Sequence, residues 1–254
     1  MSDKTNENKK IENSNENDKV ENVKEEAKNI KDENLNKKSE YKKKKEEEKS
    51  FIREVMEWVV CIVVAFTLAV LIKYFLFTPT LVMQESMTPT ILNGERVFIN
   101  RLVRTFDWEL KRGDIVTFEA PSEFELAEGE VKAAYREVEG PINSFLYYVL
   151  ESGKTSYIKR IIGLPGEHVE IKGGKVYIDG KILEENYLDD SVKTYIPVGG
   201  IDDFIVPEGY VFAMGDNRDG SSDCRLFGCV PIEKIEGRVS VRIWPLNKIG
   251  KIDK

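Results

Sequence analysis

Residues 80–92 have the sequence TLVMQESMTPTIL, which places a single serine, Ser86, between an extended-preferring run and a proline-containing turn. In such a place a backbone N–H and a hydroxyl can point at the same ligand, although most loop serines are turn or cap residues. The position of this serine favours a functional role, because the stretch begins just beyond a hydrophobic run long enough to cross a bilayer. We therefore interpret Ser86 as a candidate nucleophile that works close to a membrane surface.

The hydrophobic run, Trp58–Phe77, holds twenty residues of which only Lys73 is charged. At about 1.5 Å per residue, a helix of this length spans roughly 30 Å, the thickness of the hydrocarbon core. A buried core helix is the first alternative, but the length and the interface residues Trp58 and Tyr74 disfavour it. A cleaved signal peptide is the second, but no small-x-small site follows the run. We expect an uncleaved transmembrane anchor over residues 55–77.

Basic residues around this run predict its orientation. Six Lys and Arg residues lie between residues 42 and 53, whereas only Lys73 marks the other end before Arg96. The positive-inside rule then places the N-terminus in the cytoplasm and residues 78–254 outside the cytoplasmic membrane.

Residues 1–50 contain fourteen Lys and fourteen Asp plus Glu, with almost no aromatic or branched side chains. Such a segment cannot bury a core, so we expect a disordered, charged cytoplasmic tail rather than the alternative of a coiled coil. The formal net charge of −7 therefore belongs to residues 51–254. An acidic body argues against wide contact with nucleic acid, which binds to basic surfaces.

The chain beyond the anchor has the pattern of a mainly β domain. Short apolar or alternating runs are separated by Gly, Pro and Asp/Asn turns. Gly173-Gly174 is typical of a tight hairpin, and Asp179-Gly180 ends its second strand with another turn signal. Residues 121–155 interrupt this pattern: the first half of Leu126–Val149 has moderate helix character, and the second half is apolar and could be buried or dip into the membrane. The predicted strands are Arg96–Ile99, Asp114–Phe118, Tyr157–Ile162, His168–Ile171, Lys175–Ile178 and Tyr210–Met214.

A serine nucleophile needs a base, and the ionisable residues leave few candidates. The single histidine, His168, lies in a strand-like alternation, which disfavours a Ser-His-Asp triad and leaves a Ser–Lys arrangement. The lysine must lose its proton near neutral pH, so it needs an apolar seat. In a strand, Lys159 shares a face with Tyr157 and Ile161, which offers such a seat. A solvated strand lysine is the alternative.

The loop Gly215–Arg225 follows an apolar strand and holds many hydrogen-bonding side chains. It lacks the terminal glutamate of an EF-hand and contains two arginines, so calcium binding does not fit. We expect a rigid loop in which Ser221 hydrogen-bonds the Lys159 amine while Asp223 and Arg225 hold each other.

The three cysteines suit neither a disulfide scaffold nor a metal site. Cys61 lies inside the hydrophobic run, and Cys224 and Cys229 could pair or remain free thiols. No Cys/His cluster has metal-ligand spacing. We therefore expect no metal and no cofactor.

Four blocks in this order closely resemble the motif series of bacterial type I signal peptidases, in their Gram-positive-like, single-anchor form. The resemblance covers most of residues 51–245 and leaves the tail and the insertion at 121–155 unexplained. The blocks are Ser86–Thr90, Arg112–Phe118, Tyr157–Gly166 and Gly215–Arg225.

The resemblance implies a membrane-bound serine endopeptidase that removes N-terminal signal peptides on the outer face of the cytoplasmic membrane. In that family pattern Ser86 is the nucleophile and Lys159 the general base. Ser221 would orient the lysine, and Asp223 and Arg225 would support the loop.

The same resemblance predicts how substrate binds. The Ser86 backbone N–H would donate to the oxyanion, and Met87 would line the area that receives small substrate residues at positions −1 and −3, as in Ala-x-Ala sites. The implied partners are preprotein signal peptides, the lipid bilayer and the secretion translocon, with no nucleic acid. The chain departs from the family at Gln84, where Gly or Ser is usual, and at Cys224, where Ser is usual.

Three alternatives have different requirements. Self-cleaving repressor-type proteases share related chemistry but would need a DNA-binding domain, which residues 1–50 cannot provide. A sortase needs a Cys–His–Arg set, and no cysteine motif accompanies His168. A catalytically impaired, anchored binding protein of the same fold is the remaining alternative, and only Gln84 favours it.

Overall fold

The computed structural model describes residues 4–102, 106, 109–123, 125–127 and 129–252; of residues 4–34 and of residue 47 it describes the backbone alone. The chain forms two compact units, Met1–Phe66 and Thr67–Lys254. The second unit contains the last turns of the long helix α1 and all of the β-structure.

Helix α1 runs from Lys4 to Phe75. Its segment Leu35–Phe75 is long and apolar enough to cross a membrane, and none of its most apolar stretch is buried in protein. An apolar helix that buries nothing within the chain needs another apolar surrounding, so this segment fits the predicted anchor.

The structure differs from the disordered tail predicted for residues 1–50, because α1 already begins at Lys4. Lys and Glu are good helix formers, so a segment rich in both can form a helix without a hydrophobic core. The side chains of residues 35–46 and 48–50 are all exposed, so in the described part of the tail the charges are solvated as expected.

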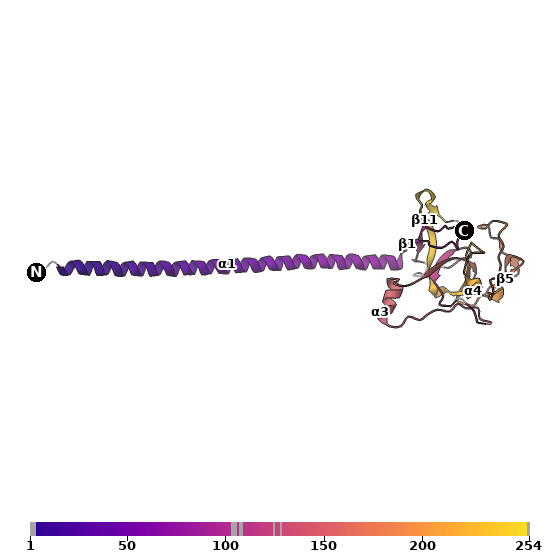
Figure 1. Ribbon diagram of the computed structural model, residues 1–254, viewed down its shortest axis with the longest axis horizontal. Coiled ribbons are helices and arrows are strands. Elements are labelled where there is room, and N and C mark those ends of the chain that lie inside the picture. The colour runs from indigo at the N-terminus through magenta and orange to yellow at the C-terminus, as the bar shows by residue number, and fades with distance from the viewer. Residues whose placement is uncertain (1–3, 103–105, 107–108, 124, 128, 253–254) are drawn as a thin grey trace. The chain divides into compact units, whose positions relative to one another are not determined.

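The second unit is mainly β, as predicted, and contains two antiparallel sheets (Figure 1). The larger has the order β1-β2-β11-β3-β4-β9-β10, with β12 paired to β11, and the smaller has the order β7-β6-β5-β8. The strands of the larger sheet are β1 Phe77–Leu81, β2 Arg96–Asn100, β3 Ile115–Glu119, β4 Ser156–Gly163, β9 Tyr210–Met214, β10 Val230–Pro231, β11 Ile235–Trp244 and β12 Gly250–Lys251. Those of the smaller are β5 His168–Lys172, β6 Lys175–Ile178, β7 Lys181–Ile182 and β8 Asp203–Ile205.

Over the part of the chain that the structure describes, five short helical segments accompany the sheets. They are α3 Pro141–Ser144, the π-helix η1 Phe145–Val149, α4 Cys224–Phe227, and the 3₁₀ turns η2 Ile232–Lys234 and η3 Leu246–Lys248. Within the insertion, the expected helix character lies in the second half of Leu126–Val149, not the first, in the residues that the structure describes.

All six predicted strands are present, with ends that agree within one residue. The predicted hairpin is confirmed, since Lys172 pairs with Lys175 across Gly173-Gly174. The predicted turn at Asp179-Gly180 is also present, and there Ile178 pairs with Lys181. The two glycines of the first turn have φ of 62° and 79°, a conformation that glycine adopts without strain.

The core consists of two clusters of buried side chains. The larger joins the two sheets and includes Ile161 of β4, Val169 of β5 and Phe212 of β9. The smaller lies under the loop that follows β1 and includes Met87 and Ile91. Each side chain of this kind stabilises the fold by about 1.5–3 kcal/mol when fully buried, so the loop around Ser86 is firmly held.

Candidate active site

The loop after β1 holds Ser86 at the protein surface but almost covered. Val82 donates its N–H to the Glu95 carbonyl oxygen at 2.9 Å, and Gly94 donates to the Val82 carbonyl oxygen at 2.8 Å, which closes the loop at its base. Ser86 is only 5% exposed, and in the described part of the chain its hydroxyl has no hydrogen-bond partner. Buried hydroxyls are rarely left without a partner, so this one is available for another role.

The loop Gly215–Arg225 lies directly against Ser86. Asn217 donates its backbone N–H to the Ser86 carbonyl oxygen at 3.0 Å, and its side-chain amide donates to the Glu85 carbonyl oxygen at 3.2 Å. At Gly215, a Cβ atom would overlap both the Ser86 carbonyl oxygen and the Ser221 hydroxyl. Only glycine therefore allows Ser86, Gly215 and Ser221 to lie this close together.

Lys159 is buried, with 1% of its surface exposed, in the centre of β4, where it pairs with Val116 of β3. Its ammonium nitrogen lies 5.3 Å from the centre of the Tyr157 ring. Burial lowers its pKa to about 8, and the nearby Asp223 carboxylate opposes this only in part. The prediction of a desolvated lysine on the Tyr157 face of the strand is confirmed by this burial. The pKa falls because water cannot stabilise the charged amine there.

Ser221 is also buried, but the expected hydrogen bond to Lys159 is not formed. Its hydroxyl has no hydrogen-bond partner among the described residues and packs against Gly215 instead. Catalytic hydrogen bonds are often long in the absence of substrate and tighten when it binds. The site thus holds two buried, unpaired hydroxyls and a lysine with a lowered pKa.

Asp223 and Arg225 hold each other, as predicted, through contacts of 2.8 and 2.9 Å. They do so on a helical turn, since Asp223 is the N-cap of α4 and accepts from the Arg225 N–H. Asp223 also accepts the Gly215 N–H at 3.0 Å. The pair therefore fixes both ends of the loop that carries Ser221.

Comparison with known proteins decides the family. The family model described as signal peptidase, peptidase S26, matches residues 55–244. The chain belongs to this family. Signal peptidase I of Bacillus licheniformis is 37% identical over 203 residues, which cover 78% of this chain and 92% of that protein. Signal peptidase IB of Staphylococcus aureus strain COL is 31% identical over 209 residues, which cover 77% and 93%.

Among solved structures, a signal peptidase I from Enterococcus faecalis V583 is 28% identical to this chain. The match covers 51% of this chain and 96% of that one, with a TM-score of 0.32. The family assignment makes this chain an S26 serine peptidase, in agreement with the resemblance seen in its four motifs.

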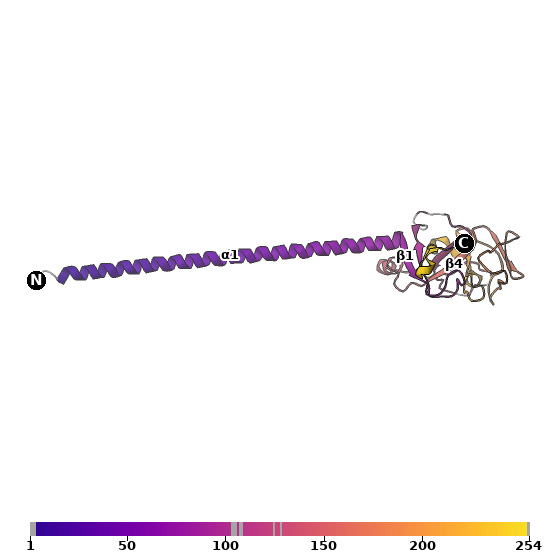
Figure 2. The same ribbon diagram turned by 90° about the horizontal axis from the view of Figure 1, so that it is seen from above.

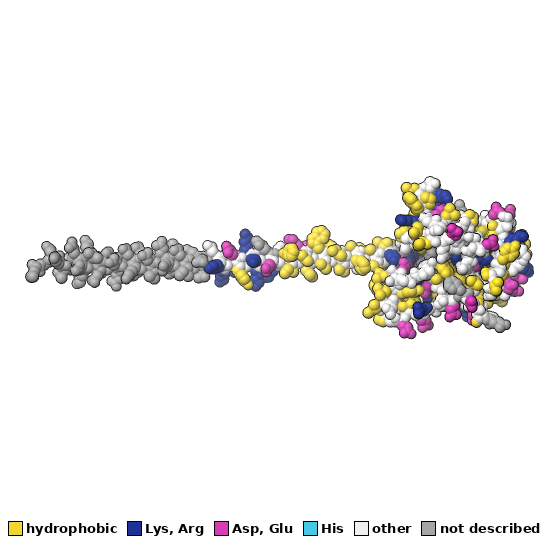
Figure 3. Space-filling model, viewed as in Figure 1, with side chains coloured by type: hydrophobic (Ala, Val, Ile, Leu, Met, Phe, Trp, Pro, Cys, Tyr) yellow, Lys and Arg dark blue, Asp and Glu magenta, His cyan; other side chains and the backbone are white. Residues whose placement is uncertain are grey.

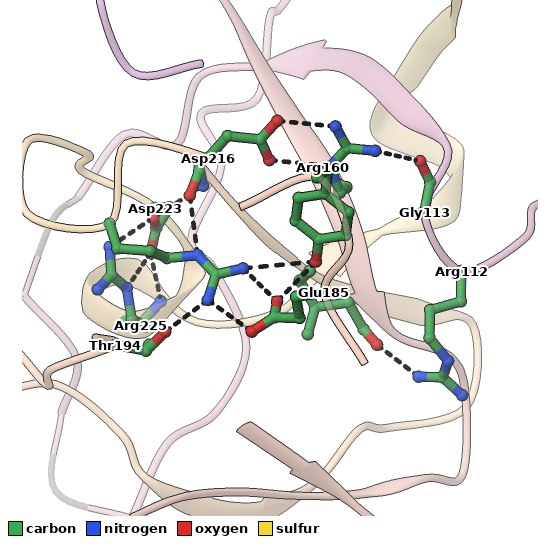
Figure 4. Close-up of polar contacts among 12 residues, drawn as sticks. Arg112, Gly113, Arg160, Glu185, Thr194, Asp216, Asp223 and Arg225 are labelled. Carbon is green, nitrogen blue, oxygen red and sulfur yellow. Dashed lines mark hydrogen bonds and ion pairs between the residues drawn. The ribbon is translucent and has the colours of Figure 1, made fainter. Parts of the chain in front are cut away.

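An ion pair that the sequence did not predict lies on the other side of β4 in this S26 peptidase. The guanidinium of Arg160 binds both carboxylate oxygens of Asp216 at 2.8 and 2.7 Å, and donates to the Gly113 carbonyl oxygen at 3.0 Å (Figure 4). The Tyr187 ring stacks at 3.8 Å from the guanidinium carbon. Strand alternation could have indicated a second buried side chain next to Lys159, but not its partner.

A second unpredicted contact joins the loop Gly215–Arg225 to the segment 185–194. Arg218 donates to the Gly215 carbonyl oxygen at 3.1 Å, and both of its terminal nitrogens bind the Glu185 carboxylate. Thr194 accepts a further hydrogen bond from Arg218 (Figure 4). The segment 185–194 therefore clasps the loop, and no local signal in the sequence indicates it.

A groove of about 410 Å³ lies beside the site, between residues 80–84 at the end of β1 and residues 155–158 at the start of β4. Gln84 lines this groove and is exposed. Met87 does not line it: the side chain is fully buried in the smaller core cluster. The turn at 85–90 points this side chain into the core, and the role of Met87 beside the small substrate residues stays a prediction.

The remaining candidate groups of the peptidase lie elsewhere. His168 is in β5 of the smaller sheet, where it contacts Asp203 at 2.6 Å. Cys61, Cys224 and Cys229 are free thiols, and burial raises the pKa of both Cys224 and Cys229. In the described ranges, no three His, Cys, Asp or Glu side chains are grouped to hold a metal ion.

Proposed function

We propose that this protein is a membrane-bound serine endopeptidase that cleaves N-terminal signal peptides from exported preproteins after a small residue, with Ser86 as nucleophile and Lys159 as general base. The observation that carries the proposal is the burial of Lys159, with a pKa lowered to about 8, near Asp223 of the same loop whose Gly215 and Asn217 contact Ser86, a serine with an unpaired hydroxyl. A lysine of this pKa is partly neutral near physiological pH and can accept a proton.

The reaction follows from these groups. Neutral Lys159 takes the Ser86 proton as the serine oxygen attacks the scissile carbonyl carbon, and the carbonyl oxygen becomes an oxyanion. When the tetrahedral intermediate collapses, the lysine ammonium gives its proton to the leaving amine and an ester to Ser86 remains. A water molecule then attacks the ester while Lys159 accepts one of its protons, and the lysine returns this proton to the Ser86 oxygen as the carboxylic acid leaves.

Further roles fall to residues around this pair. The Ser86 backbone N–H donates to the oxyanion, and the amide of Gln84 is the second donor; the position of Gln84 in the groove lining supports this role. Ser221 orients Lys159 once substrate closes the site. Asp223 and Arg225 keep the Ser221 loop in place through their ion pair.

The groove beside the site suits an extended substrate. Residues 80–84 and 155–158 provide two chain segments between which a peptide can lie and form strand-like hydrogen bonds. Shallow pockets there would admit small side chains at positions −1 and −3, as in Ala-x-Ala sites.

The proposal includes a single membrane pass with the N-terminus in the cytoplasm and residues 78–254 outside. The basic residues before the apolar segment of α1 support this orientation. The bilayer and preproteins emerging from the secretion translocon are then the natural partners.

The alternative is a catalytically impaired, membrane-anchored binding protein of the same fold. Gln84 is the feature that favours it. The glutamine side chain is long and exposed, so its amide is not held in a fixed position from which it could donate to the oxyanion. Binding without cleavage would distinguish it from a peptidase.

The test is cleavage of a preprotein with an Ala-x-Ala site by the full-length protein in lipid vesicles. We expect Ser86→Ala and Lys159→Ala each to lower the rate on the order of a thousandfold or more, since loss of one member disables a catalytic pair. Lys181→Ala, which removes an exposed lysine of β7, is the matched control and should cleave normally. Equal rates in all variants would end the Ser–Lys hypothesis, and a wild type that binds the preprotein without cleaving it would favour the binding protein.

A further inference from the structure

The insertion presents an uncharged apolar face to solvent. Residues 141–150 contain no charged side chain, and α3 and η1 occupy positions 141–149. Ile142, Phe145 and Leu146 are 73%, 48% and 40% exposed. Their spacing of three and four residues places them on one side of a helical segment. Yellow side chains gather at this part of the domain in Figure 3.

The other side of the same segment is fastened to the domain. Tyr147 donates its hydroxyl hydrogen to Glu119 at 3.1 Å, and the Lys154 ammonium lies 5.9 Å from the rings of both Tyr147 and Tyr148. Lys154 is itself paired with the buried Glu236 at 2.6 Å. These contacts hold the segment in one orientation, so the same three apolar side chains always face outward.

The end of this segment is tied to the end of the apolar helix. Glu151 pairs with Lys73, in the last turn of α1, at 3.0 Å and also binds Arg101. Arg101 in turn donates its backbone N–H to the carbonyl oxygen of Leu76, the residue after α1, at 2.8 Å. Figures 1 and 2 both show the insertion beside the last turns of α1.

We propose that Ile142, Phe145 and Leu146 dock the insertion into the interfacial region of the bilayer, as a second membrane contact beside the α1 anchor. The proposal rests on the membrane-bound arrangement proposed above. If the apolar helix spans the bilayer, Lys73 lies at its outer boundary, and the tie to Glu151 holds the three side chains at the same level. Aliphatic and aromatic side chains enter this region readily, and tyrosines favour its polar edge.

The absence of basic side chains from this segment predicts which kind of lipid it needs. Because the segment carries no Lys or Arg, and Glu137 and Glu139 precede it, docking depends on apolar burial and not on anionic headgroups. Phosphatidylcholine should therefore suffice.

The experiment uses the full-length protein with Cys61→Ser in phosphatidylcholine vesicles. An environment-sensitive fluorophore is attached at Ile142→Cys or, as a matched control, at Ile205→Cys, a similarly exposed isoleucine (63%) in β8 of the smaller sheet. We expect nitroxide-labelled phosphatidylcholine to quench the first label more strongly than the second, on the order of threefold or more. Phe145→Asp should reduce the quenching at position 142 without releasing the protein from the vesicles.

The outcomes separate the two proposals. Equal, weak quenching at both positions would overturn docking, as would a label at position 142 that responds to added signal peptide but not to lipid. Loss of the protein from floated vesicles would overturn the anchored arrangement itself. Ser86→Ala should leave the quenching unchanged, so a failure of the proposed peptidase activity would not affect this result.

Discussion

Lys159 should control the pH dependence of activity. Its burial lowers the pKa to about 8, and only the neutral amine can accept the Ser86 proton. Activity should therefore fall about tenfold per pH unit below that value and level off above it. The measurement is kcat/KM for a signal-peptide substrate across this range, and a profile that stays flat from acid to alkaline pH would contradict the role of Lys159 as base.

Gly215 should not tolerate a side chain. A Cβ atom there would overlap the Ser86 carbonyl oxygen and lie 2.6 Å from the Ser221 Cβ, so the backbone of the nucleophile loop must shift. Displacements of about 1 Å at a catalytic group can cost on the order of a hundredfold in rate. We expect a loss of that size for Gly215→Ala in a cleavage assay. Gly250→Ala, at a position with open space, is the control, and equal activity of the two variants would refute the argument.

The sequence indicated single residues where local pattern sufficed. Ser86 was predicted from its place after a hydrophobic run and Lys159 from strand alternation, and both lie buried as a catalytic pair would require. The partner of Arg160 could not be predicted in this way. Asp216 reaches it only because β9 lies beside β4, with Met214 opposite Arg160, and that pairing joins distant parts of the chain.

At the scale of elements, the clasp formed by residues 185–194 should stabilise the loop that carries Ser221. Arg218 is fully buried, so Glu185→Gln would leave its charge without a counterion. We expect the free energy of unfolding to fall by about 1–3 kcal/mol and kcat to fall more than KM changes. Glu184→Gln, its exposed neighbour, is the matched control. Denaturant unfolding and steady-state kinetics measure both effects, and identical behaviour of the two variants would count against the clasp.

Hairpins were predictable and the longest strand was not. The turns of the smaller sheet are local signals, whereas β11 (Ile235–Trp244) breaks the regular alternation through several bulges against β2 and β3. Its burial pattern consequently lacks a period of two. Its place in the centre of the larger sheet depends on pairing with strands more than a hundred residues earlier.

For the whole molecule, the proposed orientation predicts which residues reagents can reach from each side. In intact cells, a membrane-impermeant maleimide should label Ile205→Cys but not Tyr41→Cys, an exposed site in the tail, which should react only after permeabilisation. Protein with the native cysteines alone gives the background. Labelling of Tyr41→Cys from outside would reverse the orientation.

Only one residue, Leu76, separates α1 from β1. The Thr78 hydroxyl donates to the Lys73 carbonyl oxygen at 3.0 Å across this junction, so there is no free linker between the helix and the sheet. If α1 anchors the protein as proposed above, the catalytic unit cannot move away from the membrane, and it meets its substrates by lateral diffusion in the membrane plane. The proposed nucleophile then stays at a fixed height above the lipid. It would cleave bonds at that height and leave uncut those that lie farther from the membrane on an exported chain, however well their sequence fits the groove.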